Sequence, residues 1–304
     1  MHPDLFGIRN SSYMIMVALG IISCAVFYRI LAGHQKVNNK SYNFYLFLGV
    51  ASIIIGFGGS IFFQGLYDIP QRRGLFFPNS DTPTPMTFMG GLAGGVVTFL
   101  LGTILLGKRF GARQDFWTVA NILSISIVSA HALGRYGCFL AGCCYGIQND
   151  TFGVLFPGHR ERRLPTNLYE AIFLTILLAL LLIIFFLPQI YAKINSGKVD
   201  EDTINERKAE LTKHRHKLLV IYLFAYSIFR FFLEFLRGDH RGTFLFGVIS
   251  PSQIQSFIMF GIAVTLLIVV HIKGIIPFQL KSKSENLKTG DLDSEAVTTA
   301  EPEE

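Results

Sequence analysis

Seven long apolar segments constrain the fold of this 304-residue chain more than any other feature. A helix needs about 20 apolar residues to cross the hydrocarbon core of a bilayer. Only 16% of the residues are charged, compared with about 25% in soluble domains. The sequence therefore predicts an all-α, polytopic membrane protein with seven transmembrane helices rather than two soluble domains. The segments lie near residues 12–32, 44–66, 86–107, 116–138, 168–188, 218–236 and 249–271.

The distribution of lysine and arginine predicts the orientation of the chain. The loops after the first, third and fifth segments, with the C-terminal tail, carry 16 of these residues, whereas the N-terminus and the other loops carry 8. The richer side is expected to be cytoplasmic, which places the N-terminus outside and the C-terminus inside. The net charge of +6 then reflects basic loops that face anionic lipid headgroups, and nucleic acid is not an expected partner.

The chain divides into a transmembrane domain, residues 1–280, and a tail, residues 281–304. The tail is acidic and poor in large apolar residues, so we expect it to be disordered and cytoplasmic. Within the loop after the fifth segment, residues 200–216 are highly charged and predict a short surface helix.

The stretch from 131 to 146 is the first candidate site, because it places Arg135 near the end of an uncharged apolar segment. An arginine inside a membrane costs at least about 2.5–3.5 kcal/mol, so it normally has a partner or a polar cavity. The stretch also contains Gly134, Gly137, Gly142 and Gly146. Glycines at this density predict an interrupted helix whose backbone a ligand can approach closely.

Arg230 and Glu234 interrupt the sixth segment and lie four residues apart, which places them on one face of a helix. One interpretation is a buried ion pair that fixes helix packing. The other has Arg230 facing an anionic group while Glu234 orients it. Arg135 and Arg230 together suit a phosphate, because each guanidinium offers a fixed fork of donors, and in a membrane the available phosphate is on a lipid.

His131 lies four residues before Arg135, on the same helical face, and is either a general base or a hydrogen-bond partner of a neighbour. Cys138, Cys143 and Cys144 suit metal ligands, a redox pair, covalent nucleophiles or small packing residues. Their spacing is not that of repeated Cys-x-x-Cys motifs, so we favour packing and site lining, and we expect neither a metal nor a cofactor.

Five further positions allow both a structural and a functional interpretation. Gly90 and Gly91 have the spacing of small residues at a close helix contact, or they line a site with their backbone. Tyr13 is an interfacial aromatic residue or part of the site. Tyr169 and Glu170 precede the fifth apolar run, where an acidic residue is favoured by the helix dipole, or they contact a ligand.

Taken together, these stretches resemble the bacterial prolipoprotein diacylglyceryl transferase family over residues 10–272, with five motifs in the same order. The motifs correspond in chain order to residues 89–91 (His-Gly-Gly in the family), 134–139 with Gly146 (Gly-Arg-x-Gly-Asn-Phe, then Asn-Gly-Glu and Gly), 165–170 (Pro-Ser-Gln-Leu-Tyr-Glu), 229–237 (Phe-Arg-x-x-x-Glu-Phe-x-Arg) and 249–253 (Ile-Ser-x-x-Gln). Tyr13 falls where the family has a functional tyrosine.

The resemblance implies transfer of a diacylglyceryl group from phosphatidylglycerol to the lipobox cysteine thiol of an exported prolipoprotein, with release of glycerol phosphate. It implies a multi-pass protein of the bacterial plasma (inner) membrane whose active site faces the outer leaflet, with membrane lipids as its surroundings. Arg135 and Arg230 would hold the phosphate and stabilise the leaving group, and Glu234 would hold Arg230. The substrate-binding residues implied are Tyr13, Gly90, Gly91, Gly134, Gly137, Cys138, Cys143, Gly146, Tyr169, Glu170 and Gln253.

The chain departs from the family at positions that bear on proton transfer. Met89 stands where the family has histidine, Ser60 where it has arginine, and Cys138, Ala141 and Cys143 where it has asparagine and glutamate. Because methionine cannot take a proton, we hypothesise that His131 supplies the base. Two alternatives follow from the departures: a paralogue that uses another acceptor, and a non-catalytic lipid-binding or transport protein.

Overall fold

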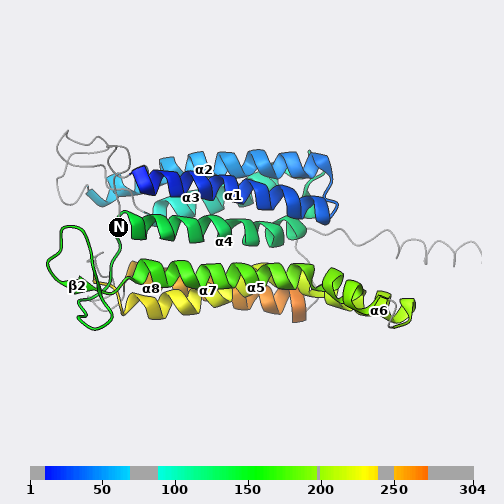
Figure 1. Ribbon diagram of the computed structural model, residues 1–304. Helices are drawn as coiled ribbons and strands as arrows, with labels where there is room; N and C mark the ends of the chain where they lie inside the picture. Colours follow the sequence, from blue (N-terminus) through cyan, green and yellow to red (C-terminus); the bar gives the residue numbers. More distant parts are fainter. Residues whose placement is uncertain (1–10, 69–87, 197–198, 239–249, 273–304) are drawn as a thin grey trace, which may run out of the picture. The chain divides into compact units, whose positions relative to one another are not determined.

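Helices make up most of the described chain. The computed structural model describes residues 11–68, 88–196, 199–238 and 250–272. These residues form eight α-helices (Figure 1): α1 (Ser11–His34), α2 (Asn39–Asp68), α3 (Phe88–Leu106), α4 (Phe116–Leu140), α5 (Thr166–Asn195), α6 (Glu201–Thr212), α7 (Leu218–Glu234) and α8 (Pro251–Leu266). The short elements are two 3-10 turns (Arg113–Asp115 and Lys213–Lys217), a π-helical turn (Leu267–Ile272) and a two-stranded hairpin of β1 (Val154–Leu155) and β2 (Arg162–Arg163).

Six helical segments of the described residues are long and apolar enough to cross a membrane, and the apolar stretch Gly90–Leu106 within α3 is shorter. Large apolar side chains on these helices are exposed, such as Met14 at 66% and Ile54 at 66%, as expected for surfaces that face lipid. The prediction of an all-helical, polytopic membrane protein is confirmed. The count of seven spans and the orientation stay predictions.

Two predicted helix ends are wrong. Helix α4 continues through Gly134 and Gly137 to Leu140, so Arg135 lies inside a regular helix and not at an interrupted end. A glycine in a helix interior costs only about 1 kcal/mol relative to alanine. The packing of α4 offsets this cost. Helix α5 continues through Pro188 to Asn195, whereas the predicted segment ends near residue 188.

The buried Arg215 binds α5 close to this proline. Its Nε donates to the Phe185 carbonyl oxygen at 2.7 Å, and its Nη2 donates to the Gln189 side chain. The carbonyl that loses its helical donor at Pro188 is that of Ile184, so Arg215 supports the neighbouring turn and does not replace the missing hydrogen bond. The predicted surface helix over 200–216 is confirmed as α6, which begins after the capping side chain of Asp200 and buries no residue. The predicted tail over 281–304 lies outside the described residues.

The chain forms two compact units, and each is described by itself: residues 1–37 with 117–275, and residues 38–116 with 276–304. In the second unit, α2 and α3 pack through glycines. A methyl group on Gly59 would lie 2.9 Å from the Gly90 carbonyl oxygen, and one on Gly56 would lie 2.8 Å from that of Gly91. The close helix packing predicted for Gly90 and Gly91 is confirmed.

In the first unit, α1 packs against α4, and α7 packs against both α5 and α8 (Figure 1). Gly20 of α1 lies against the backbone of Ala130, and the Ser23 hydroxyl donates to the Ser129 hydroxyl at 3.0 Å. These small side chains let two membrane helices approach closely. The first unit contains Arg135, Arg230 and their partners.

The glycine contact between α2 and α3 yields a test of packing. Gly59→Ala inserts a methyl group against a backbone oxygen, so we expect it to lower the free energy of unfolding by about 1–3 kcal/mol, the usual cost of overpacking. Gly58→Ala is the matched control, because in the described part of the chain no atom beyond the local helix backbone lies within 4 Å of a methyl group there. Thermal unfolding of both variants in detergent measures the difference. Equal unfolding temperatures would contradict the packing described.

Candidate active site

Three helices of the first unit meet at one buried carboxylate, Glu170 of α5, which has no exposed surface. Its Oε1 accepts a hydrogen bond of 2.8 Å from the Tyr226 hydroxyl of α7. The same oxygen lies 3.0 Å from Arg135 Nε of α4, and His131 Nε2 lies 3.7 Å from it. Glu170 therefore joins α4, α5 and α7 through a single oxygen atom.

Arg135 thus has the partner that an arginine within a membrane helix requires. Its side chain is 15% exposed, while that of Glu170 is fully buried. The interpretation of Glu170 as an acid placed by the helix dipole is wrong, because the first turn of α5 contains no acidic residue. Its charge is balanced instead by the Arg135 guanidinium.

Arg230 of α7 is the second buried guanidinium. Its Nη2 lies 2.8 Å from Glu234 Oε2 and donates to the Ser252 hydroxyl of α8 at 2.7 Å. The prediction that Arg230 and Glu234 share a helical face is confirmed. Arg135 and Arg230 both lie within electrostatic range of the Glu170 carboxylate, and we treat the two ion pairs as one buried cluster.

This cluster contains two guanidinium and two carboxylate groups and retains unused hydrogen-bonding capacity. Within the described residues, buried Arg230 Nη1 and Glu170 Oε2 have no hydrogen-bond partner. Buried polar atoms are normally satisfied. An unpaired donor on a guanidinium can bind an oxygen of an anionic ligand, and the partial exposure of Arg135 gives such a ligand a second contact.

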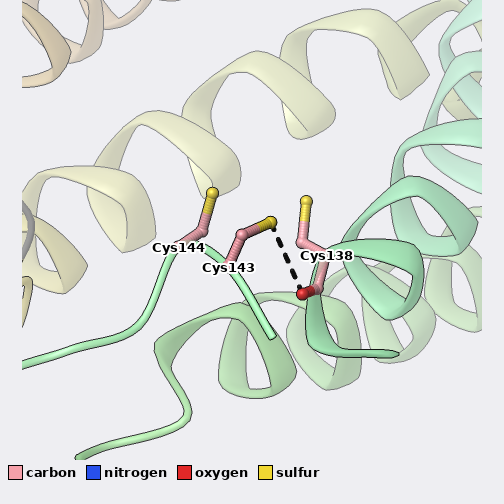
Figure 2. Close-up of side chains that lie close together, drawn as sticks. All are labelled: Cys138, Cys143 and Cys144. Carbon is pink, nitrogen blue, oxygen red and sulfur yellow. Dashed lines mark hydrogen bonds between the residues drawn. The ribbon is translucent and has the colours of Figure 1, made fainter. Parts of the chain in front are cut away.

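Three cysteine sulfur atoms lie within 4.8 Å of one another beyond the end of α4 (Figure 2). Cys138 is buried in the last turn of the helix, while Cys143 and Cys144 are partly exposed. The chain turns back through positive φ angles at Gly142, +73°, and Cys144, +60°. We call the three residues Cys138, Cys143 and Cys144 the thiol cluster.

The start of α5 fixes the loop that carries the thiol cluster. Asn167 Nδ2 donates to the Cys143 carbonyl at 2.6 Å, and the Thr166 hydroxyl donates to that of Cys144 at 3.1 Å. The Cys143 thiol itself donates to the Cys138 carbonyl, 3.6 Å between sulfur and oxygen (Figure 2). The backbone of the cluster is therefore held in place by side chains outside it.

Hydrogen bonding to the Cys138 and Cys144 side chains, followed by burial, raises the pKa of the Cys143 thiol well above its ordinary range. A thiol that stays protonated is a poor nucleophile. This disfavours the interpretation of Cys143 as a covalent nucleophile acting alone.

The other predicted site residues belong to both units of the chain. Tyr13 of α1 is 40% exposed and its ring lies against Gly137, 3.2 Å from the position of an added methyl group. Among the described residues, no atom outside the local helix backbone lies within 4 Å of such a group at Gly134. Tyr169 is partly buried at the start of α5. Gly90 and Gly91 belong to the second unit and are not placed relative to these residues.

Two predicted substrate-binding residues, Gln253 and Gly146, have structural roles. Gln253 forms a capping box with Ser250 at the start of α8, in which each side chain bonds the other's backbone N–H. Gly146 lies where three segments meet, so an added methyl group would come within 2.5 Å of the Leu236 carbonyl oxygen. Their role in substrate binding stays a prediction. The side chain of Met89 lies outside the described residues.

Sequence reasoning missed Tyr226 and Ser252. Tyr226 precedes Arg230 by four residues, the same spacing that identified Glu234, so the helical face already contained the signal. Ser252 is an unspecified position of the motif at residues 249–253, so no residue preference marked it.

Comparison with known proteins places the chain among one group of enzymes. A family model described as prolipoprotein diacylglyceryl transferase matches residues 4–269. The phosphatidylglycerol–prolipoprotein diacylglyceryl transferase 2 of Clostridium perfringens is 29% identical over 269 residues, which cover 85% of this chain and 90% of the relative.

Two further relatives have the name phosphatidylglycerol–prolipoprotein diacylglyceryl transferase. That of Clostridium tetani is 27% identical over 279 residues, covering 86% of this chain and 94% of the relative. That of Campylobacter hominis is 32% identical over 169 residues, which cover 55% of this chain and 50% of the relative.

The hydrogen bond from Tyr226 to Glu170 yields a test of the buried cluster. Tyr226→Phe removes a donor to a buried carboxylate, so we expect the free energy of unfolding to fall by about 1.5–3 kcal/mol. Tyr222→Phe is the matched control, because Tyr222 stacks on Tyr226 but, in the part of the chain described here, gives Glu170 no hydrogen bond. Denaturant unfolding in detergent measures both. An equal loss in the two variants would contradict the contact.

Proposed function

The chain belongs to the prolipoprotein diacylglyceryl transferase family, and we propose that it transfers a diacylglyceryl group from phosphatidylglycerol to the lipobox cysteine thiol of exported prolipoproteins. The observation that carries this proposal is the buried cluster in which Glu170 and Glu234 hold two guanidinium groups on α4 and α7. The relatives are named for this reaction, which favours it over a paralogue with another acceptor and over a non-catalytic lipid-binding or transport protein.

The two arginines suit the charge changes of the reaction. Phosphatidylglycerol has one negative charge on its phosphodiester, and the departing glycerol phosphate gains a second as the bond between carbon and oxygen breaks. Guanidinium groups already fixed by carboxylates stabilise this charge without reorganising during the reaction. Arg135 would contact the phosphate through its exposed part, and Arg230 through Nη1.

Fixing the arginines is the role that we assign to their partners. Glu170, which Tyr226 fixes by a hydrogen bond, holds Arg135, and Glu234 and Ser252 hold Arg230. Tyr13, Gly134 and Gly137 would line the adjacent substrate space, because Tyr13 is exposed and Gly134 has no side chain to obstruct a ligand. We retain Gly90, Gly91, Cys138, Cys143, Gly146, Tyr169 and Gln253 as proposed substrate-binding residues.

We further propose seven transmembrane helices in residues 1–280 of a bacterial plasma (inner) membrane protein, with the N-terminus outside and residues 281–304 as a cytoplasmic tail. The distribution of lysine and arginine supports this orientation. The end of α4 and the thiol cluster would then face the outer leaflet, where an exported acceptor arrives.

The reaction is tested by incubating the purified protein with labelled phosphatidylglycerol and a lipobox peptide. Mass spectrometry should show a thioether-linked diacylglyceryl group on the peptide. Arg135→Gln should reduce the rate by about 10²–10³-fold, as expected for loss of one preorganised donor. The control Arg162→Gln changes an exposed arginine of β2 and should leave the rate unchanged. Unaltered transfer by folded Arg135→Gln would refute the phosphate role.

A separate substitution tests the base. His131→Gln keeps a hydrogen-bonding side chain beside Glu170 but cannot take a proton near neutral pH. If His131 is the base, the rate should fall by about 10²–10⁴-fold while the protein still binds lipid. Undiminished turnover in a folded variant would exclude His131 from proton transfer.

A further inference from the structure

We propose that the thiol cluster binds Zn²⁺ through three thiolates and leaves a fourth coordination position open for the acceptor thiol. The proposal rests on the proposed function, because it concerns how the acceptor is activated. The observation that carries it is the convergence of three sulfur atoms, all within 4.8 Å of one another, from positions that are not regularly spaced in sequence (Figure 2).

The geometry of the cluster is close to that of a zinc site. With Zn–S bonds of about 2.3 Å, tetrahedral coordination separates sulfur atoms by about 3.8 Å. Side-chain rotations of Cys138, Cys143 and Cys144 that bring the sulfur atoms together by about 1 Å or less satisfy this distance, and the backbone can stay where Thr166 and Asn167 hold it.

The backbone conformation of Cys144 belongs to the turn that brings the three thiols together. Its φ of +60° lies in the left-handed region, which is uncommon for a non-glycine residue, although the exposed Lys36 adopts it as well. A disulfide would use only two of the sulfur atoms and leave the third unexplained.

Three protein ligands with one open position are the arrangement of catalytic zinc sites, whereas structural sites are closed by four. Cys138 is buried and the other two residues are partly exposed. The open position would therefore lie on the accessible side of the cluster. Thiolates select soft ions such as Zn²⁺ over Mg²⁺ or Ca²⁺.

Zinc binding would release the protons of all three thiols, including the Cys143 proton that hydrogen bonding otherwise retains. A zinc ion with three thiolates has a net charge of −1, and the Arg135 guanidinium lies within electrostatic range of Cys138 and Cys144. The same guanidinium is the proposed phosphate contact. A thiol bound to the zinc would therefore lie beside the phosphodiester of the lipid.

The chemistry then needs no separate protein base at the position of Met89. Coordination to zinc deprotonates the acceptor thiol, and the proton leaves to solvent. The thiolate sulfur attacks the glyceryl carbon attached to the phosphate oxygen, forming the S–C bond as the C–O bond breaks. The electron pair of that bond stays on the phosphate oxygen, which departs as glycerol phosphate, and nothing is oxidised or reduced.

The test uses the full chain, purified in detergent, stripped with a chelator and titrated with Co²⁺ as a spectroscopic probe for zinc. We expect one Co²⁺ per chain with sulfur-to-cobalt charge-transfer absorption. Serine at Cys138, Cys143 or Cys144 should weaken Co²⁺ binding by more than about 100-fold. Loss of a residue that only contacts a metal ligand costs up to about 100-fold, and loss of a ligand should cost more. The matched control is Cys24→Ser in α1, which should bind as the unsubstituted protein does.

Adding a lipobox peptide tests the open position. The cysteine peptide should increase the charge-transfer absorption, whereas its serine analogue should not. Absence of cobalt–sulfur absorption, or equal binding by the serine variants, would overturn the metal site. Cobalt binding with no response to the cysteine peptide would overturn acceptor coordination.

Transfer assays separate this proposal from the proposed function. Restoration of transfer by Zn²⁺ after chelation would support the zinc site. Undiminished transfer by metal-free protein would overturn the zinc proposal and leave the proposed function intact. Binding of Co²⁺ and peptide without any diacylglyceryl transfer would support the site and count against the proposed function instead.

Discussion

The structure of the first unit depends on the neutralisation of Arg135 by Glu170. A guanidinium within an apolar helix bundle is costly without a counter-charge, and removing one partner of a buried ion pair costs about 3–5 kcal/mol. Glu170 comes from α5 and is also bonded by Tyr226 from α7, so one carboxylate offsets the charge of α4 and holds three helices together. The contact that fixes the fold is thus also the contact that orients the proposed catalytic arginine.

A second ion pair, Arg230 with Glu234, makes the buried cluster electrically balanced before any lipid arrives. A balanced set of charges costs less to bury than two isolated cations. The guanidinium groups can nevertheless act on a phosphate, because hydrogen-bond donors remain where the carboxylates do not reach. Specific recognition in such a site depends on the direction of these donors more than on a surplus of positive charge.

Features with a short repeat could be predicted from the sequence, and features that depend on distant contacts could not. The apolar segments, the pairing of Arg230 with Glu234 and the charged helix α6 all follow from local periodicity. The partner of Arg135 lies 35 residues away, so no spacing identifies it. The contact of Arg215 with the α5 backbone near Pro188 joins residues 30 positions apart, and the thiol cluster depends on a turn whose positive φ at Cys144 no propensity favours.

The junction at Gly146 has a mechanical consequence. The residues that follow the thiol cluster bond both to the approach of α5, through Gly146 N–H and the Leu164 carbonyl at 2.7 Å, and to the end of α7, through Ile147 N–H and the Leu236 carbonyl at 2.9 Å. The sulfur atoms and the helix of Arg230 are therefore tied into one frame. The proposed substrates would therefore have to fit a backbone that these hydrogen bonds hold in place.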